Sequence, residues 1–138
     1  MDDVVVDASV FVSRLFEHDV HHDPSARWFE DREREGGLFV VPAILPAEVA
    51  GAVRRRLDDG IVARRIVVWL MRLPALRVVT LDRRVGEQIA QLAADLGLRG
   101  ADASYVAVAR MLGLPLVTWD QDQSRRAEGT VATLTPSA

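Results

Sequence analysis

Cysteine and lysine are both missing from this chain of 138 residues. Without cysteine the chain forms no disulfide and no zinc–thiolate site, and it has no thiolate nucleophile. Without lysine it lacks the residue that a Walker-type phosphate loop and Schiff-base chemistry both require. All 17 basic residues are therefore arginines, which bind phosphates as planar forks rather than as point charges.

The chain also lacks a large net charge and any long apolar run. Its net charge is −3, from 17 basic and 20 acidic residues, so its overall field does not indicate nucleic-acid binding, although acids around a metal can face a locally basic surface. No apolar stretch is long enough to span a bilayer. The start, Met1-Asp2-Asp3, lacks the positive charge of a secretion signal, so we expect a cytoplasmic protein without membrane contact.

What is present is the composition of a soluble globular domain. Hydrophobic residues make up 49% of the chain and charged residues 27%, which excludes a disordered protein. The length suits one domain with a substantial core and is too short for two ordinary ones. We therefore predict a single domain over residues 1–138.

Two apolar runs, one near each end of the chain, stop on a carboxylate. The β-branched run at 4–6 predicts a buried strand, followed by Asp7 and a helix over 8–17. The run at 114–118 has the same form and is followed by Asp120. In an open α/β sheet, ligands bind beyond the carboxyl ends of the strands. If these two strands are neighbours, their carboxylates meet.

Strands and helices alternate along the chain, which predicts a parallel sheet covered by helices on both faces. The predicted strands are 4–6, 38–41, 76–81, 114–118 and 130–134, and the predicted helices are 8–17, 25–35, 46–56, 61–73, 83–96 and 99–113.

Further acids stand where helices begin. Glu48 lies in a first turn opened by Pro46, and Asp102 lies at the start of the helix over 99–113. Taken alone, Glu48 is explained by the helix dipole and Asp102 by capping. Asp82 is predicted to be the N-cap of the helix over 83–96.

A histidine-rich segment invites a second metal hypothesis. His18, His21 and His22 occur with Asp19 and Asp23, but the polar run predicts a solvated loop rather than a metal site. The better metal hypothesis uses carboxylates alone. Clustered carboxylates need a cation to stay ionised, and oxygen-only ligation suits Mg²⁺ or Mn²⁺.

The acids and their flanking residues, taken together and in order, resemble the PIN-domain ribonucleases, most closely the VapC-type toxins of bacterial toxin–antitoxin pairs. The resemblance covers nearly the whole chain and rests on Val5-Val6-Asp7-Ala8-Ser9, Pro46-Ala47-Glu48-Val49, Gly100-Ala101-Asp102-Ala103 and Val117-Thr118-Trp119-Asp120-Gln121-Asp122. It implies a PIN-like three-layer α/β/α sandwich with a five-stranded parallel sheet in the order 3-2-1-4-5, which makes strands one and four neighbours.

The resemblance also implies a site and a reaction. Asp7, Glu48, Asp102 and Asp120 would be the catalytic residues and would hold one or two Mg²⁺ or Mn²⁺ ions. Asp122 is a further candidate ligand, with a solvated loop acid as the equal alternative. Ser9 and Thr118 would orient the aspartates, unless they only cap a helix and end a strand. The reaction would be hydrolysis of an RNA phosphodiester by a metal-activated water.

Three other classes compete with this hypothesis. A haloacid-dehalogenase-like phosphatase needs a second acid two residues after Asp7, where this chain has Ser9. A response-regulator receiver needs a lysine after its last strand. The third alternative is a catalytically silent PIN-fold binding subunit, against which the intact acid set argues.

Family toxins are held inactive by an antitoxin, so we expect a VapB-like protein partner, and a homodimer. Small residues at 50–52 on the Glu48 helix, and the helix with Trp28 and Phe29, are candidate docking surfaces. The alternative is that both helices pack on this protein's own core or form the homodimer.

Overall fold

The computed structural model describes residues 2–137, in which five strands form one sheet. The strands are β1 (Val4–Val6), β2 (Phe39–Pro42), β3 (Leu76–Val79), β4 (Leu116–Val117) and β5 (Thr133–Leu134). The helices are α1 (Ala8–Leu15), α2 (His22–Glu35), α3 (Leu45–Leu57), α4 (Gly60–Met71), α5 (Arg83–Leu96), α6 (Gly100–Leu112) and α7 (Gln121–Ala127).

The sheet is parallel throughout and runs in the order β3-β2-β1-β4-β5, which confirms the predicted topology. Strand β1 is central, because Val5 pairs with Val40 of β2 on one side and with Leu116 of β4 on the other. All three β1 valines are buried, as expected for a strand covered on both faces.

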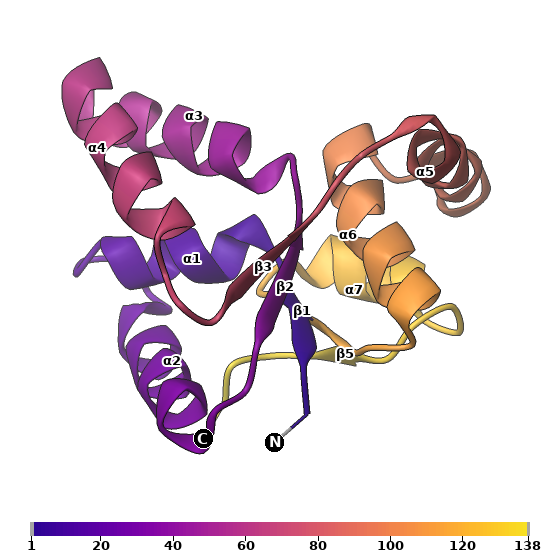
Figure 1. The fold of residues 1–138 in the computed structure, drawn as a ribbon, viewed down its shortest axis with the longest axis horizontal. Helices are drawn as coiled ribbons and strands as arrows, with labels where there is room; N and C mark the ends of the chain where they lie inside the picture. Colours follow the sequence, from indigo (N-terminus) through magenta and orange to yellow (C-terminus); the bar gives the residue numbers. More distant parts are fainter. Residues whose placement is uncertain (1, 138) are drawn as a thin grey trace.

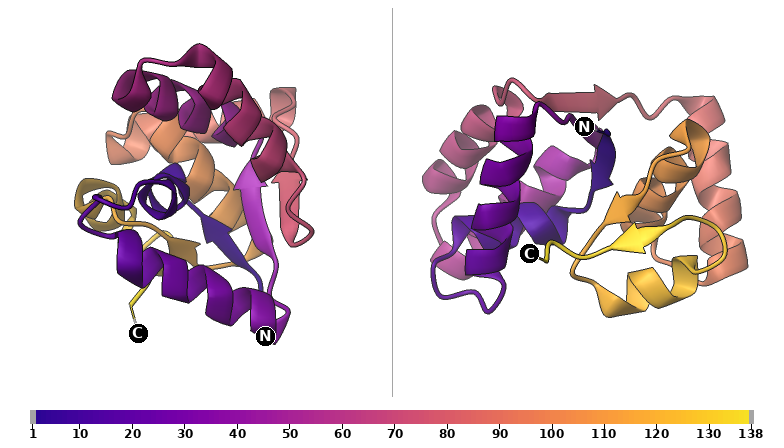
Figure 2. Two further views of the ribbon diagram at one scale, coloured as in Figure 1. Left: turned by 90° about the vertical axis from the view of Figure 1, so that its left-hand side faces the viewer. Right: turned by 90° about the horizontal axis from the view of Figure 1, so that it is seen from below.

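Helices cover both faces of the sheet and give a three-layer α/β/α fold. Figures 1 and 2 show α1 to α4 on one face and α5 to α7 on the other. Helix α6 is the most deeply buried of the second layer, with seven consecutive buried residues from Ala103 to Ala109. Because α6 ends next to the start of β4, its first turn lies at the carboxyl edge of the sheet.

Aromatic side chains fill the space between α2 and the sheet. Phe29 is fully buried, with its ring centroid 5.1 Å from those of Phe11 and Phe39. Trp28 packs edge-on against Phe29 at 5.1 Å. Both residues therefore pack on this protein's own core, which is the alternative stated for them above.

The observed elements differ from the predicted ones mainly at their ends. Helix α1 stops at Leu15 instead of residue 17, and α2 starts at His22 instead of residue 25, because Pro24 is tolerated in a first helical turn. Helix α7 is absent from the prediction, since its sequence Gln-Asp-Gln-Ser-Arg-Arg-Ala has no apolar periodicity. The predicted N-cap at Asp82 is confirmed, with its Oδ1 accepting a hydrogen bond from Val85 N at 2.9 Å.

None of the helices between residues 2 and 137 combines the length and the apolar character needed to cross a membrane.

Candidate active site

The pairing of β1 with β4 brings the first and last acids of the predicted set to the same place. Asp7 N donates to Val117 O at 2.9 Å, so the residues that follow the two strands are neighbours. Each acid caps the helix that it precedes: Asp7 Oδ2 accepts from Ser9 N at 3.0 Å, and Asp120 Oδ1 accepts from Gln123 N at 3.0 Å. Asp7 is only 5% exposed, so its charge is held in a poorly solvated position.

The hydroxyl of Thr118 lies between these two acids. It donates to Asp7 Oδ2 at 3.3 Å and accepts from Asp120 N at 3.0 Å. Ser9 Oγ accepts from Trp119 N at 3.1 Å and lies 3.4 Å from Thr118 Oγ1. The two hydroxyls therefore fix the backbone that presents Asp7 and Asp120.

Glu48 and Asp102 reach the same edge from the two helical layers. Each lies in the first turn of its helix, α3 and α6 respectively, but neither is the N-cap, which is Ile44 in α3 and Arg99 in α6. Capping therefore does not account for Asp102. Its Oδ2 lies 3.7 Å from Arg99 Nε, and the Arg99 side chain is 92% exposed.

The four carboxylates act on one another electrostatically. Burial raises the pKa of Asp7 above its ordinary value, hydrogen bonds from Ser9 and Gln123 oppose this rise, and the charge of Asp120 adds to it. Burial also raises the pKa of Glu48 and of Asp102, and for each the charge of Asp7 adds to the effect. A site that penalises negative charge in this way favours a cation.

Asp122 has the weakest link to the other candidates, since its charge is the smallest of the causes that act on the pKa of Asp102. It is exposed on the first turn of α7 and pairs with two arginines of the same helix, Arg125 at 2.5 Å and Arg126 at 3.0 Å. The charges of Asp7, Glu48, Asp102 and Asp120 thus act on one another, whereas Asp122 lies mainly in a surface ion-pair network.

Two buried polar residues that the sequence analysis missed touch this cluster. Gln123 is fully buried, and its Nε2 donates to Asp7 Oδ1 at 3.3 Å and to Asp102 O at 3.1 Å. Tyr105 is also fully buried and donates to Glu48 Oε1 at 2.6 Å. Neither has a local sequence signal, because their partners lie 116 and 57 residues away along the chain.

The donor chemistry of the cluster fits a hard divalent cation. Asp7, Glu48, Asp102 and Asp120 offer only oxygen atoms, which is the preference of Mg²⁺ and Mn²⁺. As oriented here, no three acidic or histidine side chains within residues 2–137 converge closely enough to form a ready-made metal site.

The histidines do not join the acids. His21 stacks on Trp119 with ring centroids 3.9 Å apart, and His22 Nδ1 lies 3.2 Å from Ser13 O at the start of α2. The segment is a loop up to His21, as predicted, and His22 begins α2; these two side chains are half-buried by their contacts, whereas His18 is exposed.

The family model of the PIN domain matches residues 4–129, which is most of the chain. The protein therefore belongs to the PIN-domain family. No curated protein matches the sequence.

Solved structures share this fold at low sequence identity. The sarcin-ricin loop cleaving toxin VapC20 of Mycobacterium tuberculosis matches with a TM-score of 0.78 and 20% identity, over 93% of this chain and 96% of that one. FitAcB of Neisseria gonorrhoeae matches with a TM-score of 0.71 and 22% identity, over 99% and 98% of the two chains. The VapBC2 complex of Rickettsia felis, bound to a DNA fragment from its own promoter, matches with a TM-score of 0.71 and 13% identity, over 98% of each chain.

Proposed function

We propose that this protein is a metal-dependent endoribonuclease of the VapC toxin type. The observation that carries the proposal is the group of four carboxylates, Asp7, Glu48, Asp102 and Asp120, delivered to one edge of the sheet and each coupled electrostatically to others. Family membership supports it, as does the fold shared with a toxin that cleaves the sarcin-ricin loop.

These four side chains would hold Mg²⁺ or Mn²⁺. When bound, the ion supplies an activated water and neutralises charge on the phosphate undergoing attack. The chain's own residues do the positioning: Thr118 and Gln123 hold the two sides of Asp7. Arg99, exposed beside Asp102, offers a guanidinium fork to an RNA phosphate at the mouth of the site. Hydrolysis would leave a 5′-phosphate and a 3′-hydroxyl.

Cleavage of labelled RNA by the purified protein tests this proposal. We expect cleavage with Mg²⁺ or Mn²⁺ and none with excess chelator, with no hydrolysis of a small aryl phosphate. Hydrolysis of the aryl phosphate without RNA cleavage would favour the phosphatase alternative. Metal binding without either activity would favour the silent binding subunit.

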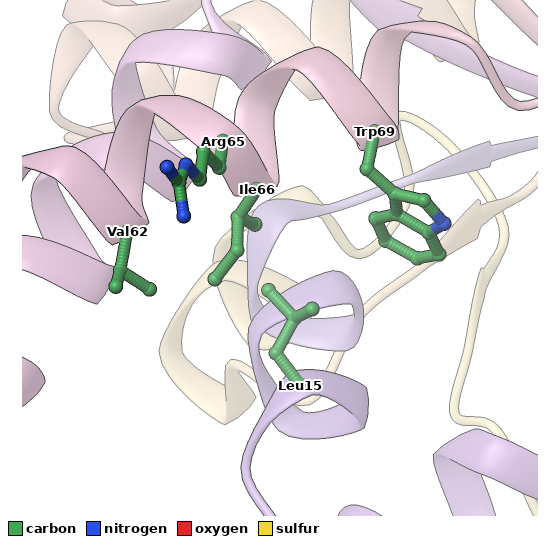
Figure 3. A pocket seen from close by; sticks show the side chains of 5 residues that line it. All are labelled: Leu15, Val62, Arg65, Ile66 and Trp69. Atoms are coloured by element: carbon green, nitrogen blue, oxygen red, sulfur yellow. The ribbon is translucent and has the colours of Figure 1, made fainter.

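We also propose an antitoxin partner, because the fold is that of known toxins and because the surface of α4 carries an exposed apolar hollow. A hollow of about 280 Å³ lies between the end of α1 and α4, lined by Leu15, Val62, Arg65, Ile66 and Trp69. In Figure 3, Leu15 of α1 faces Ile66 of α4, with Trp69 beside them. Ile61 and Val68, 56% and 49% exposed, extend the apolar surface along α4.

We propose that an amphipathic helix of the antitoxin, carrying at least one carboxylate, covers this hollow. Its apolar face would fill the hollow, and its acid would meet the arginines that border it. Arg65 lines the hollow, and the Arg14 guanidinium lies 5.6 Å from the centroid of the Trp69 ring. The structures that share this fold include a toxin–antitoxin complex from Klebsiella pneumoniae, which supports this class of partner.

A further inference from the structure

The hydrogen bond between Tyr105 and Glu48 joins two different helical layers at the edge of the acid cluster. Tyr105 is the single tyrosine of the chain and lies on α6, whereas Glu48 lies on α3. The hydroxyl is 2.6 Å from Glu48 Oε1, a short distance typical of a neutral donor bound to a carboxylate. The tyrosine ring is fully buried, so the hydroxyl has little freedom to turn elsewhere.

Glu48 needs such a contact more than Asp7 and Asp120 do. Asp7 and Asp120 are short side chains, each fixed by a backbone N–H at the start of a helix. Glu48 has one more rotatable bond, and Tyr105 is its only hydrogen-bond donor among residues 2–137. The charges of Asp7 and Asp102 act on the Glu48 carboxylate and would push it away from the cluster.

The position of Tyr105 is rigid. It follows Asp102 by three residues, so both side chains arise from the same turn of α6. This helix packs against β1, β2 and β4, and the residues on either side of Tyr105, Ser104 and Val106, are also buried. A phenol held in this way fixes the distance between the Glu48 carboxylate and the helix that carries Asp102.

We propose that Tyr105 is a positioning residue for the divalent cation: it holds Oε1 of Glu48, so that Oε2 is presented to the ion together with Asp7 and Asp102. The inference rests on the proposed function and deepens it. Removing the hydroxyl should weaken metal binding and leave the protein surface unchanged, because Tyr105 is fully buried.

Isothermal titration of Mg²⁺ and Mn²⁺ into Tyr105→Phe tests the proposal. We expect the metal Kd to rise about 10–100-fold, the usual cost of losing a residue that orients a ligand. The metal concentration needed for half-maximal cleavage should rise in parallel, with little change in KM for RNA at saturating metal. Ser104→Ala is the matched control, because it removes a buried hydroxyl from the same helix, where Ser104 bonds only to Ala101 O.

A double-mutant cycle separates positioning from general packing. In a Glu48→Gln background, Tyr105→Phe should cause no further loss of metal affinity, whereas a packing defect would lower the affinity again. Equal Kd values for the wild type and a folded Tyr105→Phe would overturn the inference and leave the proposed function standing. Failure of the wild type to bind either metal would overturn both.

A spectroscopic measurement on the unmutated side chain keeps the test independent of the folding of any Tyr105 variant. Labelling with [¹³Cζ]tyrosine gives one resonance, since the chain has one tyrosine. Saturating Mg²⁺ should shift this resonance in the wild type and leave it in place in Glu48→Gln. A wild-type resonance that does not respond to bound Mg²⁺ would contradict the proposal.

Discussion

At the scale of single residues, Asp7 and Asp120 combine helix capping with the metal binding that we propose for them. One oxygen of each caps a helix, Asp7 Oδ2 at α1 and Asp120 Oδ1 at α7. A helix N-terminus stabilises negative charge, which partly offsets the cost of crowding acids together. Substitution by asparagine preserves the cap, since the amide oxygen accepts the same bond, and it removes the charge that we propose binds the metal.

We therefore predict that Asp7→Asn loses metal binding and lowers RNA cleavage by at least about 100-fold, with the fold retained. Because burial raises the pKa of Asp7, an ionised carboxylate there destabilises the metal-free protein at neutral pH. Removing the charge should make the metal-free variant as stable as the wild type or more stable. Titration calorimetry measures the loss of metal binding, and urea unfolding measures the stability of the metal-free variant.

The matched control for Asp7→Asn is Asp82→Asn. Asp82 is also an N-cap, at α5, but it follows the edge strand β3 and lies outside the acid cluster. We expect this variant to keep wild-type metal binding and cleavage. Full activity of Asp7→Asn at matched purity and metal concentration would remove Asp7 from the mechanism.

The sequence indicated the acids but not the neutral residues that hold them. Asp7, Glu48, Asp102 and Asp120 lie at strand ends and helix starts, but Asp82 does so as well, so it was the resemblance to PIN domains that selected these four. Tyr105 gave no such signal, because a buried tyrosine in an apolar helix has the same sequence context whether or not it contacts a carboxylate. Its role depends on a partner that only the folded chain brings near.

At the scale of elements, α7 is the feature that the sequence analysis failed to predict. Its seven residues are mostly polar, and only Gln123 and Ala127 are buried. A short helix with so small an apolar face has no detectable periodicity. It forms because Asp120 caps it and because Gln123 ties it to α1 and α6 through Asp7 and Asp102.

We predict that Gln123→Met destabilises the protein by about 1–3 kcal/mol, since it fills the same volume and leaves Asp7 Oδ1 and Asp102 O without their donor. The same change at the exposed neighbour Gln121 should cost less than about 0.5 kcal/mol. Urea unfolding compares the two variants. Equal stabilities would mean that the bonds of Gln123 contribute nothing to holding α7 in place.

Helix α4 carries the second prediction at this scale. Trp69→Glu should weaken capture of a co-expressed antitoxin by at least about tenfold, because it puts a charge into the apolar hollow. Met111→Glu on α6 is the control, since Met111 and Trp69 have similar exposure, 40% and 44%, on opposite layers of the fold. Binding is measured by co-purification, with circular dichroism to check folding.

The same experiment tests one other surface, on α3, and one other occupant of the hollow, a second copy of this chain. Loss of capture in Ala50→Arg, with Trp69→Glu unaffected, would place the partner on α3, as the small residues of that helix suggested. If Trp69→Glu instead converts a dimer into a monomer without affecting capture, then a second copy of the chain covers the hollow.

At the scale of the whole molecule, the clustered acids make stability depend on pH and on metal. The pKa values of Asp7, Glu48 and Asp102 are raised by folding, so the folded state binds more protons than the unfolded state above the ordinary carboxyl pKa of about 4. The contribution of these groups to the stability of the folded state is therefore largest at acid pH, and it is lost as the pH rises through their raised pKa values.

We predict that metal-free protein gains stability from these groups as pH falls from neutral toward about 5, and that saturating Mn²⁺ raises the Tm more at pH 7 than at pH 5. Paired thermal melts at the two pH values measure both trends. A Tm shift that is absent at pH 7, or larger at pH 5, would contradict a shared carboxylate site.

The arrangement of the whole sheet was predictable because alternating apolar runs and amphipathic helices leave few topologies open. The resemblance to PIN domains then specified the order in which the strands lie, and β1 between β2 and β4 confirms it. The exact ends of α1 and α2 were not predictable, because they depend on how the segment between them packs, with His21 stacked on Trp119.

Residues far apart in the sequence meet at the site, since 116 residues separate Asp7 from Gln123. Strand β1 is synthesised long before β4, its neighbour in the sheet. The acids therefore cannot gather on a nascent chain, and a fragment that ends before Asp120 has no complete site. If the proposed activity is correct, premature termination or proteolysis that removes this last segment would leave an inactive product, and each new molecule would become active only after the segment with Asp120 has been synthesised.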